Sequence, residues 1–171
     1  SLAQLSAEER ASFLAEGCEA SELGAAAGVG ALPMTNVDWC EAATFCAFAG
    51  KRLCGEQDSE SEWQTVCTDG DNAEFPYQEL ADPDKCRIQA EEPVPSGSLA
   101  TCATPTGVLD LVGNVREWTA ECNGTSPQAA CAVRGGSYLD DAGSAGCEAR
   151  KSVERNKRSA DLGFRCCADQ P

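Results

Sequence analysis

Twelve cysteines in a chain of 171 residues without any histidine constrain the fold more than any other feature of the sequence. Their number is even, their spacings are irregular, and no pair is separated by two residues. Zinc frameworks, which cluster cysteine and histidine ligands, are therefore excluded or disfavoured. So many thiols would be reactive in a reducing cytosol. We expect a disulfide-stapled domain from an oxidising compartment: extracellular, periplasmic or at the cell surface.

The charge balance excludes two classes of partner. The chain has 28 acidic residues against 13 lysines and arginines, a formal net charge of −15. Nucleic acids and anionic membranes attract clustered cations, so no nucleic-acid partner is expected. The sequence also has no apolar run long enough to be a membrane-spanning segment. The one basic cluster, at residues 150–158, alternates with glutamates and is expected to be a solvated face, with a binding role as the weaker alternative.

Three helices are expected from capping patterns. The first is predicted within residues 1–17, with Ser6 and Glu9 as a capping box and a stop at Gly17. The second, over about residues 39–49, has its apolar side chains at helical spacing after the capping pair Asp38 and Glu41. The third is expected to start at Ser59, with Glu62 in capping-box register.

The rest of the chain is expected to be loops and short strands. Residues 23–33 are rich in glycine and alanine without periodicity, and residues 68–105 contain several prolines. Strands are predicted at residues 133–138 and 163–167. The paired glycines Gly135 and Gly136 lack the other residues of a phosphate-binding loop, so they indicate close approach of another backbone. The fold class is therefore α+β and loop-rich.

Four motifs occur in a fixed order over most of the chain: AGKRL at residues 49–53, GVLDLVGNVREW at 107–118, RGGSY at 134–138 and LGFRC at 162–166. Together they resemble the formylglycine-generating enzyme (sulfatase-modifying factor) domain family. The resemblance implies a C-type-lectin-like fold, with two helices packed around small twisted antiparallel sheets. It also implies that residues 1–171 form a single domain that lacks the family's N-terminal hairpin.

The residues that perform the family's chemistry are absent. Active members oxidise a substrate cysteine with oxygen, using two cysteines that hold copper(I). The first of these corresponds to Asp140 in this chain, and no cysteine lies between Tyr138 and Cys147. Ser137 is retained, but Arg116 replaces the family's tryptophan. A related branch holds iron with histidines, which this chain lacks, so neither copper nor iron is expected and the chain resembles a catalytically degenerate member.

A calcium site of the family is retained. The resemblance assigns carboxylate ligands to Asp110 and Glu117, and main-chain carbonyl ligands to Gly113 and Val115. Oxygen-only ligation suits this hard cation. The alternative is that Asp110 and Glu117 are surface residues of a tight turn. We expect calcium as a structural cofactor.

The resemblance also implies two long-range disulfides, Cys46–Cys166 and Cys67–Cys147. Two more pairs, Cys86–Cys102 and Cys122–Cys131, are guesses for local staples. Sequence reasoning leaves four cysteines without assigned partners: Cys18, Cys40, Cys54 and Cys167.

Three functions remain possible on these grounds. The first is a non-catalytic extracellular module, stabilised by calcium, that binds a protein or glycan partner or assembles with itself. The second is a copper-dependent formylglycine-generating oxidase with displaced catalytic groups. The third is a lectin-like variable ligand-binding protein. The missing thiols after Ser137 favour the first over the second.

Overall fold

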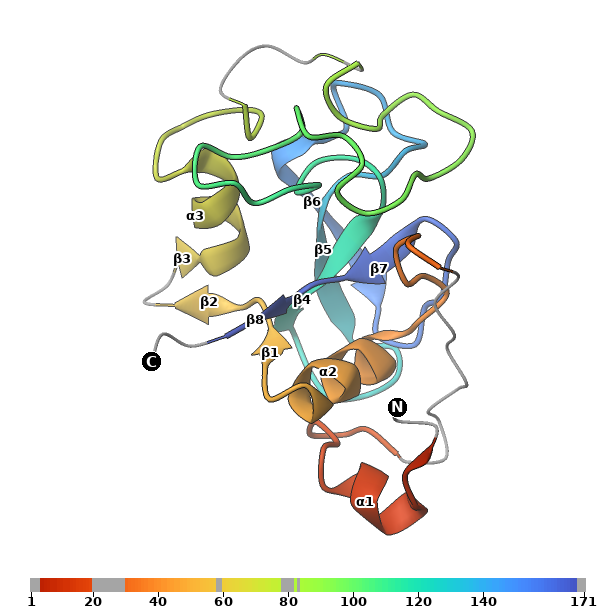
Figure 1. The fold of residues 1–171 in the computed structure, drawn as a ribbon. Helices are drawn as coiled ribbons and strands as arrows, with labels where there is room; N and C mark the ends of the chain where they lie inside the picture. Colours follow the sequence, from red (N-terminus) through yellow and green to blue (C-terminus); the bar gives the residue numbers. More distant parts are fainter. Residues whose placement is uncertain (1–3, 20–29, 58–59, 78–81, 83, 169–171) are drawn as a thin grey trace.

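The computed structural model describes residues 4–19, 30–57, 60–77, 82 and 84–168 (Figure 1). The described part contains three helices: α1 (Ala7–Ala11), α2 (Trp39–Phe48) and α3 (Glu62–Thr68). Its strands are β1 (Arg52–Leu53), β2 (Glu56–Gln57), β3 (Glu60–Ser61), β4 (Arg116–Cys122), β5 (Ala130–Gly135), β6 (Gly146–Glu154), β7 (Leu162–Phe164) and β8 (Cys166–Cys167).

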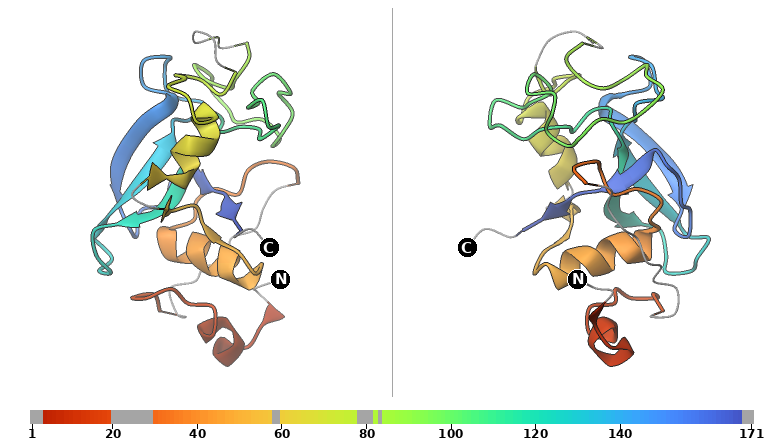
Figure 2. Two further views of the ribbon diagram at one scale, coloured as in Figure 1. Left: turned by 90° about the vertical axis from the view of Figure 1, so that its left-hand side faces the viewer. Right: turned by 45° about the vertical axis from the view of Figure 1, so that its right-hand side comes forward.

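A four-stranded sheet with the order β6-β5-β4-β7 forms the centre of the fold. Its strands β4, β5 and β6 are antiparallel neighbours, whereas β7 runs parallel to β4. Two small sheets, β1-β8 and β2-β3, complete the strand pairing. Figures 1 and 2 show α2 and α3 at separate places beside the sheet, with the long connection between α3 and β4 covering one end. The expected α+β, loop-rich architecture is confirmed.

The helix predictions differ in accuracy. Helix α2 carries the expected capping box of Asp38 and Glu41 and ends one residue before the predicted boundary. Helix α1 has the capping box of Ser6 and Glu9, but the prediction that it continues to Gly17 is wrong. The hydroxyl of Ser12 donates to the Glu9 carbonyl, and such a side-chain bond competes with helix continuation.

The start of α3 was also misplaced. Ser61, not Ser59, caps this helix by accepting a hydrogen bond from the Gln64 amide. Ser59 itself lies outside the described residues, as does most of the predicted loop at residues 23–33. The carboxylate of Glu62 bonds to Arg52 and to the Gly55 amide instead of closing a capping box. The first-turn glutamate therefore connects α3 to the small sheets.

The strand predictions were incomplete. Of the predicted strand at 133–138, residues 133–135 lie in β5, which starts at Ala130 and ends at Gly135. The predicted strand at 163–167 is divided between β7 and β8. Strands β4 and β6 were not predicted. In β4 the consecutive residues Glu117, Trp118 and Thr119 are all buried. A central strand covered on both faces does not show the alternation on which strand prediction depends.

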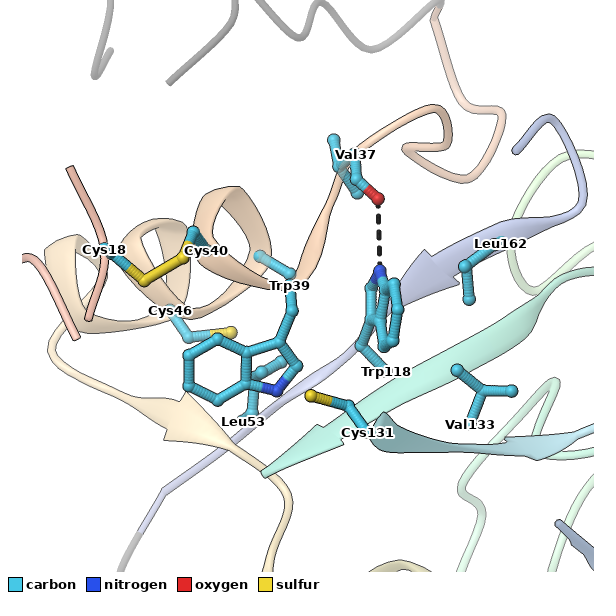
Figure 3. Packing of buried hydrophobic residues seen from close by; sticks show 11 residues of the cluster. Cys18, Val37, Trp39, Cys40, Cys46, Leu53, Trp118, Cys131, Val133 and Leu162 are labelled. Carbon is cyan, nitrogen blue, oxygen red and sulfur yellow. Dashed lines mark hydrogen bonds between the residues drawn. A yellow bond between two sulfur atoms is a disulfide. The ribbon is translucent and has the colours of Figure 1, made fainter. Parts of the chain in front are cut away.

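Two hydrophobic clusters lie on different sides of β4. One contains Trp39, Trp118 and Leu162, and its residues come from α2 and the central sheet (Figure 3). Both indole groups are satisfied, because Trp118 donates to the Val37 carbonyl at 3.1 Å and Trp39 donates to the Thr119 carbonyl at 2.8 Å. The second cluster is lined by α3 and the loops, and includes Trp63, Phe75, Cys67, Leu111 and Val112.

Six disulfides account for all twelve cysteines. Cys46–Cys166 and Cys67–Cys147 are present, as are the local pairs Cys86–Cys102 and Cys122–Cys131. The four cysteines that sequence reasoning left without partners form Cys18–Cys40 and Cys54–Cys167. The adjacent residues Cys166 and Cys167 therefore fasten the C-terminal strand to α2 and to the segment after β1.

The glycine pair after β5 allows the close approach expected from the sequence. A Cβ atom on Gly135 would lie 2.3 Å from the Leu111 carbonyl oxygen, and one on Gly136 would lie 2.7 Å from the Cβ of Ala145. Both glycines have positive φ angles. Gly135 therefore lets the loop that precedes β4 approach the end of β5, and Gly136 does the same for the residue that precedes β6.

The contribution of each disulfide should depend on the length of chain that it closes. Cys46–Cys166 spans 120 residues and Cys122–Cys131 spans 9. On the chain-entropy model, replacing both cysteines by alanine should lower the free energy of unfolding by about 5 kcal/mol for the first pair and about 3 kcal/mol for the second. Guanidinium unfolding of the two double variants tests this order. Equal losses would contradict the loop-closure explanation.

Candidate functional site

A partly buried ion cluster occupies the position that the family resemblance assigns to the oxidase centre. Arg116 begins β4, Asp140 lies in the turn after β5, and Asp161 precedes β7. The Arg116 guanidinium contacts the Asp140 carboxylate at 2.5 Å and the Asp161 carboxylate at 2.7 Å. From β6, the ammonium group of Lys151 contacts the second Asp140 oxygen at 2.7 Å. One carboxylate thus connects β4, β6 and the turn after β5.

Ser137 forms part of the same cluster. Its amide and its hydroxyl both donate to the Asp140 carboxylate, at 2.8 and 2.9 Å. The Arg116 guanidinium in turn donates to the Ser137 hydroxyl at 3.2 Å. Ser137 is fully buried. The retained serine therefore supports a turn that is closed by Asp140.

The cluster holds Asp140 in its ionised form. Burial alone would raise the pKa of Asp140, but hydrogen bonds from Lys151, Arg116 and Ser137 outweigh it and hold the pKa well below the usual aspartate range. The carboxylate therefore carries a full negative charge at all physiological pH values. It is a hard oxygen group between two cations.

This arrangement does not fit copper(I), which prefers soft thiolate ligands. Every cysteine of the chain is in a disulfide. Among the described residues, the one group of three or more side chains that could converge on a metal is Cys54, Glu62 and Cys167. Its two sulfur atoms are bonded to each other. The folded chain thus presents no thiolate pair in place of the one that the family uses.

The turn before β4 brings the two expected calcium carboxylates to one cationic group. The Glu117 carboxylate receives hydrogen bonds from Arg165 at 2.6 and 2.7 Å, and from the Trp63 indole at 2.7 Å. Arg165 also donates to the Leu109 carbonyl at 3.0 Å. The Asp110 carboxylate accepts from the Gly97 amide at 2.6 Å. Gly113 and Val115 lie buried in the same turn.

Electrostatics in this turn leave negative charge that is only partly compensated. Burial raises the pKa of Asp110, and Glu117 raises it further, whereas the Gly97 amide and Arg165 act in the opposite direction. Burial lowers the pKa of Arg165, but Glu117 and Asp110 outweigh it, so the pKa is raised. Two carboxylates thus share one guanidinium. Calcium prefers oxygen ligands, but both Glu117 oxygens already accept hydrogen bonds from Arg165.

Sequence reasoning missed several participants. Lys151 and Asp161 complete the cluster around Arg116. Lys151 was expected on a solvated basic face, and its contact with Asp140 was not predicted. Arg165 lies within the LGFRC motif, so the motif gave its position but not its contact with Glu117. Trp63 is buried on its helix, and its hydrogen bond to Glu117 was not predicted.

A separate pocket of about 270 Å³ lies beside the start of α2. The cationic groups of its wall are held by the protein itself. Arg155 stacks on Trp39, with its guanidinium carbon 4.2 Å from the ring centroid, and Arg158 contacts Asp38 at 2.7 Å and Glu41 at 2.9 Å. These arginines therefore have structural roles, and none of the residues expected at the family's sites lines this pocket.

Comparison with known proteins assigns the fold. The chain superposes on the solved structure of Treponema denticola variable protein 1 with a TM-score of 0.60 at 14% identity, covering 82% of this chain and 72% of that one. This is the C-type-lectin-like fold implied by the motifs. The family model described as sulfatase-modifying factor enzyme 1-like domain matches residues 6–170. The chain belongs to this family.

Two relatives differ in the activity that their names state. The chain is 31% identical over 154 residues to the inactive C-alpha-formylglycine-generating enzyme 2 of Bos taurus, and 29% identical over 168 residues to the formylglycine-generating enzyme of Mus musculus. Both matches cover 80% of this chain, but 50% and 44% of the relatives. The chain therefore spans about half the length of these curated relatives.

The described helices include none with the length and apolar character required to cross a membrane.

The cluster should make folding stability sensitive to acid. Because the folded-state pKa of Asp140 is depressed, its contribution is present above the unfolded-state pKa of about 3.9 and is lost as the pH falls below that value. Asp140→Asn should lower the free energy of unfolding by about 1–3 kcal/mol at pH 7 and flatten its decline between about pH 4 and pH 2. Urea unfolding across this range tests both effects. If the free energy of unfolding of the variant declined with falling pH as steeply as that of the unmodified protein, Asp140 would not be the source of the acid sensitivity.

Proposed function

We propose that this protein is a non-catalytic extracellular module that binds a protein or glycan partner, or assembles with itself, on a formylglycine-generating-enzyme frame. The observation that carries the proposal is the ion pair of Arg116 and Asp140. It replaces a tryptophan and a copper-binding cysteine of the family with opposite charges that satisfy each other. The disulfide content and the relative named as inactive support the same reading.

The proposal is favoured over a displaced oxidase by the state of the sulfur atoms. Copper(I) chemistry requires thiolates, and a displaced centre would need an existing disulfide to open. The half-buried pair Cys54–Cys167 is the one that lies beside a further possible ligand, Glu62. Glu62 is held by Arg52 at 2.6 Å, and this nearby positive charge opposes cation binding.

A variable ligand-binding function is the second candidate. Leu139, in the turn that carries Asp140, is 59% exposed, although its neighbours Ser137 and Tyr138 are buried. The ion cluster therefore supports a turn whose apolar tip faces solvent. The fold shared with Treponema denticola variable protein 1 is compatible with a display surface at this place.

The unmodified protein should form no aldehyde. The test is incubation with copper(I), oxygen and a cysteine-containing peptide, followed by mass spectrometry, with an active family member as positive control. Asp140→Cys should remain inactive as well, because it supplies one thiolate next to Arg116 and no second one. Aldehyde produced by the unmodified chain would disprove the non-catalytic assignment.

We further propose that calcium stabilises the turn at residues 110–117. Asp110 and Glu117 would provide carboxylate oxygens, and Gly113 and Val115 main-chain carbonyls. Bound calcium would neutralise the charge that Arg165 compensates only in part, and would fix the turn before β4. Asp110 supports this proposal, because it is partly buried and Arg165 compensates its charge only in part. Calcium would take the place of Arg165 on one Glu117 oxygen.

Removing calcium should lower the melting temperature, and restoring it at about 100 times its dissociation constant should stabilise the fold by about 2.7 kcal/mol. Asp110→Gly should abolish this response. Glycine tolerates the left-handed backbone at this position, where φ is 58°, so the change removes the carboxylate without adding strain. Glu117 is a poorer choice because it also bonds Arg165 and Trp63.

Asp69→Gly is the matched control. Asp69 is exposed, has φ of 55°, and lies at the end of α3, so this variant should keep the calcium response. A melting curve of the unmodified protein that does not change with chelator or calcium would refute the site.

A further inference from the structure

Strand β6 is an edge of the central sheet, and its outer side has no strand partner in the described part of the chain. It is nine residues long, and β5 is its one strand partner there. Near its start the Cys147 amide donates to the Glu74 carbonyl and the register with β5 shifts, so the regular open edge is the segment from Arg150 to Glu154. The left view of Figure 2 shows it at the outer side of the sheet, away from α2. A long open edge presents unpaired main-chain groups to which another strand can add.

The register identifies which main-chain groups face outward. The Arg155 amide donates to the Ala129 carbonyl, so residues 155 and 129 form a hydrogen-bonded pair across β5 and β6. Hydrogen-bonded and non-hydrogen-bonded pairs alternate along an antiparallel ladder. Residues 150, 152 and 154 therefore direct their amide and carbonyl groups away from β5, and of these groups the Glu154 carbonyl already accepts from the Lys157 amide. The separation of 4.0 Å between the Cα atoms of Cys122 and Cys131 agrees with the same alternation on the other side of β5.

The side chains of these three residues share one face and are solvent-exposed. They are Arg150, Ser152 and Glu154. Arg150 makes one long contact of 3.4 Å to Glu121, and its side chain remains 53% exposed. The outward edge therefore presents a positive residue and a negative residue, separated by a small neutral one.

We propose that β6 pairs antiparallel with β6 of a second copy of this chain, about a two-fold axis at Ser152. In this register Arg150 of each copy lies opposite Glu154 of the other, and Ser152 lies opposite itself. Directly opposite side chains on one face are neighbours, so both charge pairs are favourable. The two central sheets then form one continuous sheet across the dimer.

The other registers along this edge lack that complementarity. A two-fold axis at Arg150 or at Glu154 places like charges opposite each other. An axis at Lys151 brings Arg150 opposite Ser152 and forms no opposite-charge pair. The sequence of the edge is thus self-complementary in the register centred on Ser152. The paired side chains lie on the face of β6 opposite to Lys151 of the ion cluster. This inference specifies the self-assembly named in the proposed function, and its test measures dimerisation, so it can fail while the non-catalytic assignment stands.

The experiment is sedimentation equilibrium of the full chain over a concentration series at 0.15 M salt. We expect a reversible monomer–dimer equilibrium. Arg150→Glu and Glu154→Arg should each raise the dissociation constant at least about tenfold, because each makes two like-charge contacts per dimer. The double exchange Arg150→Glu with Glu154→Arg should restore dimerisation, which a folding defect would not do.

Glu148→Arg is the matched control. Glu148 lies where the β5–β6 register shifts, outside the regular edge from Arg150 to Glu154, so the dissociation constant of the dimer should stay unchanged. Ser152→Cys adds the one free thiol of the chain at the two-fold axis. It should form an intermolecular disulfide at least about ten times faster than Glu148→Cys, because residues opposite each other in a ladder are within disulfide distance.

Three results would overturn the proposal. The first is a monomer at every concentration, and the second is a dimer that both single charge reversals leave intact. The third is protection of the β6 amides from hydrogen exchange only when an extended peptide is added. The edge would then bind a different partner and not a second copy of the chain.

Discussion

The rest of the structure depends on the ion pair and hydrogen bonds of the buried Glu117 carboxylate. This carboxylate lies on the central strand β4 and receives hydrogen bonds from Trp63 of α3 and from Arg165, between β7 and β8. An unpaired carboxylate in this place would lower the free energy of unfolding by several kcal/mol. Trp63 and Arg165 must therefore both stay in contact with Glu117. Trp63 belongs to one hydrophobic cluster, and the next residue along β4, Trp118, belongs to the other. The ion pair thereby fixes the two clusters relative to each other.

The same strand positions both polar centres. Successive side chains of a strand point to opposite faces, so Glu117 faces the calcium-site turn while Arg116 faces the ion cluster. Arg116 and Asp140 depend on each other, because replacing either alone would leave the other charge half-buried with reduced compensation. The two departures from the family's oxidase site therefore form one coupled substitution. A single reversion does not recreate a site for a soft metal, since the remaining charged partner stays in place.

Local signals in the sequence predicted local structure well. The capping box of Asp38 and Glu41 located α2, and the motifs located the turn around Asp110. The capping box at Ser6 marked where α1 starts but contained no information on its end. The partners of the charged residues could not be predicted in the same way. Lys151 contacts Asp140 because β6 lies next to β5. The order of strands in a sheet depends on the whole chain, so the residues next to Lys151 and Asp140 in the sequence do not predict this contact.

The distribution of charge explains why β6 stands out as a contact surface. The chain has 13 basic residues against 28 acidic ones, and several arginines, including Arg116, Arg134 and Arg165, are used inside the fold to hold buried carboxylates. Few cations are left for the exterior, so two copies repel each other over most of their surface. On β6 the exposed Arg150 lies four residues before Glu154, and the edge can therefore meet its own copy with opposite charges aligned. General repulsion combined with one self-complementary edge favours a defined dimer over disordered association, because the net charge opposes contacts that lack such opposite-charge pairs.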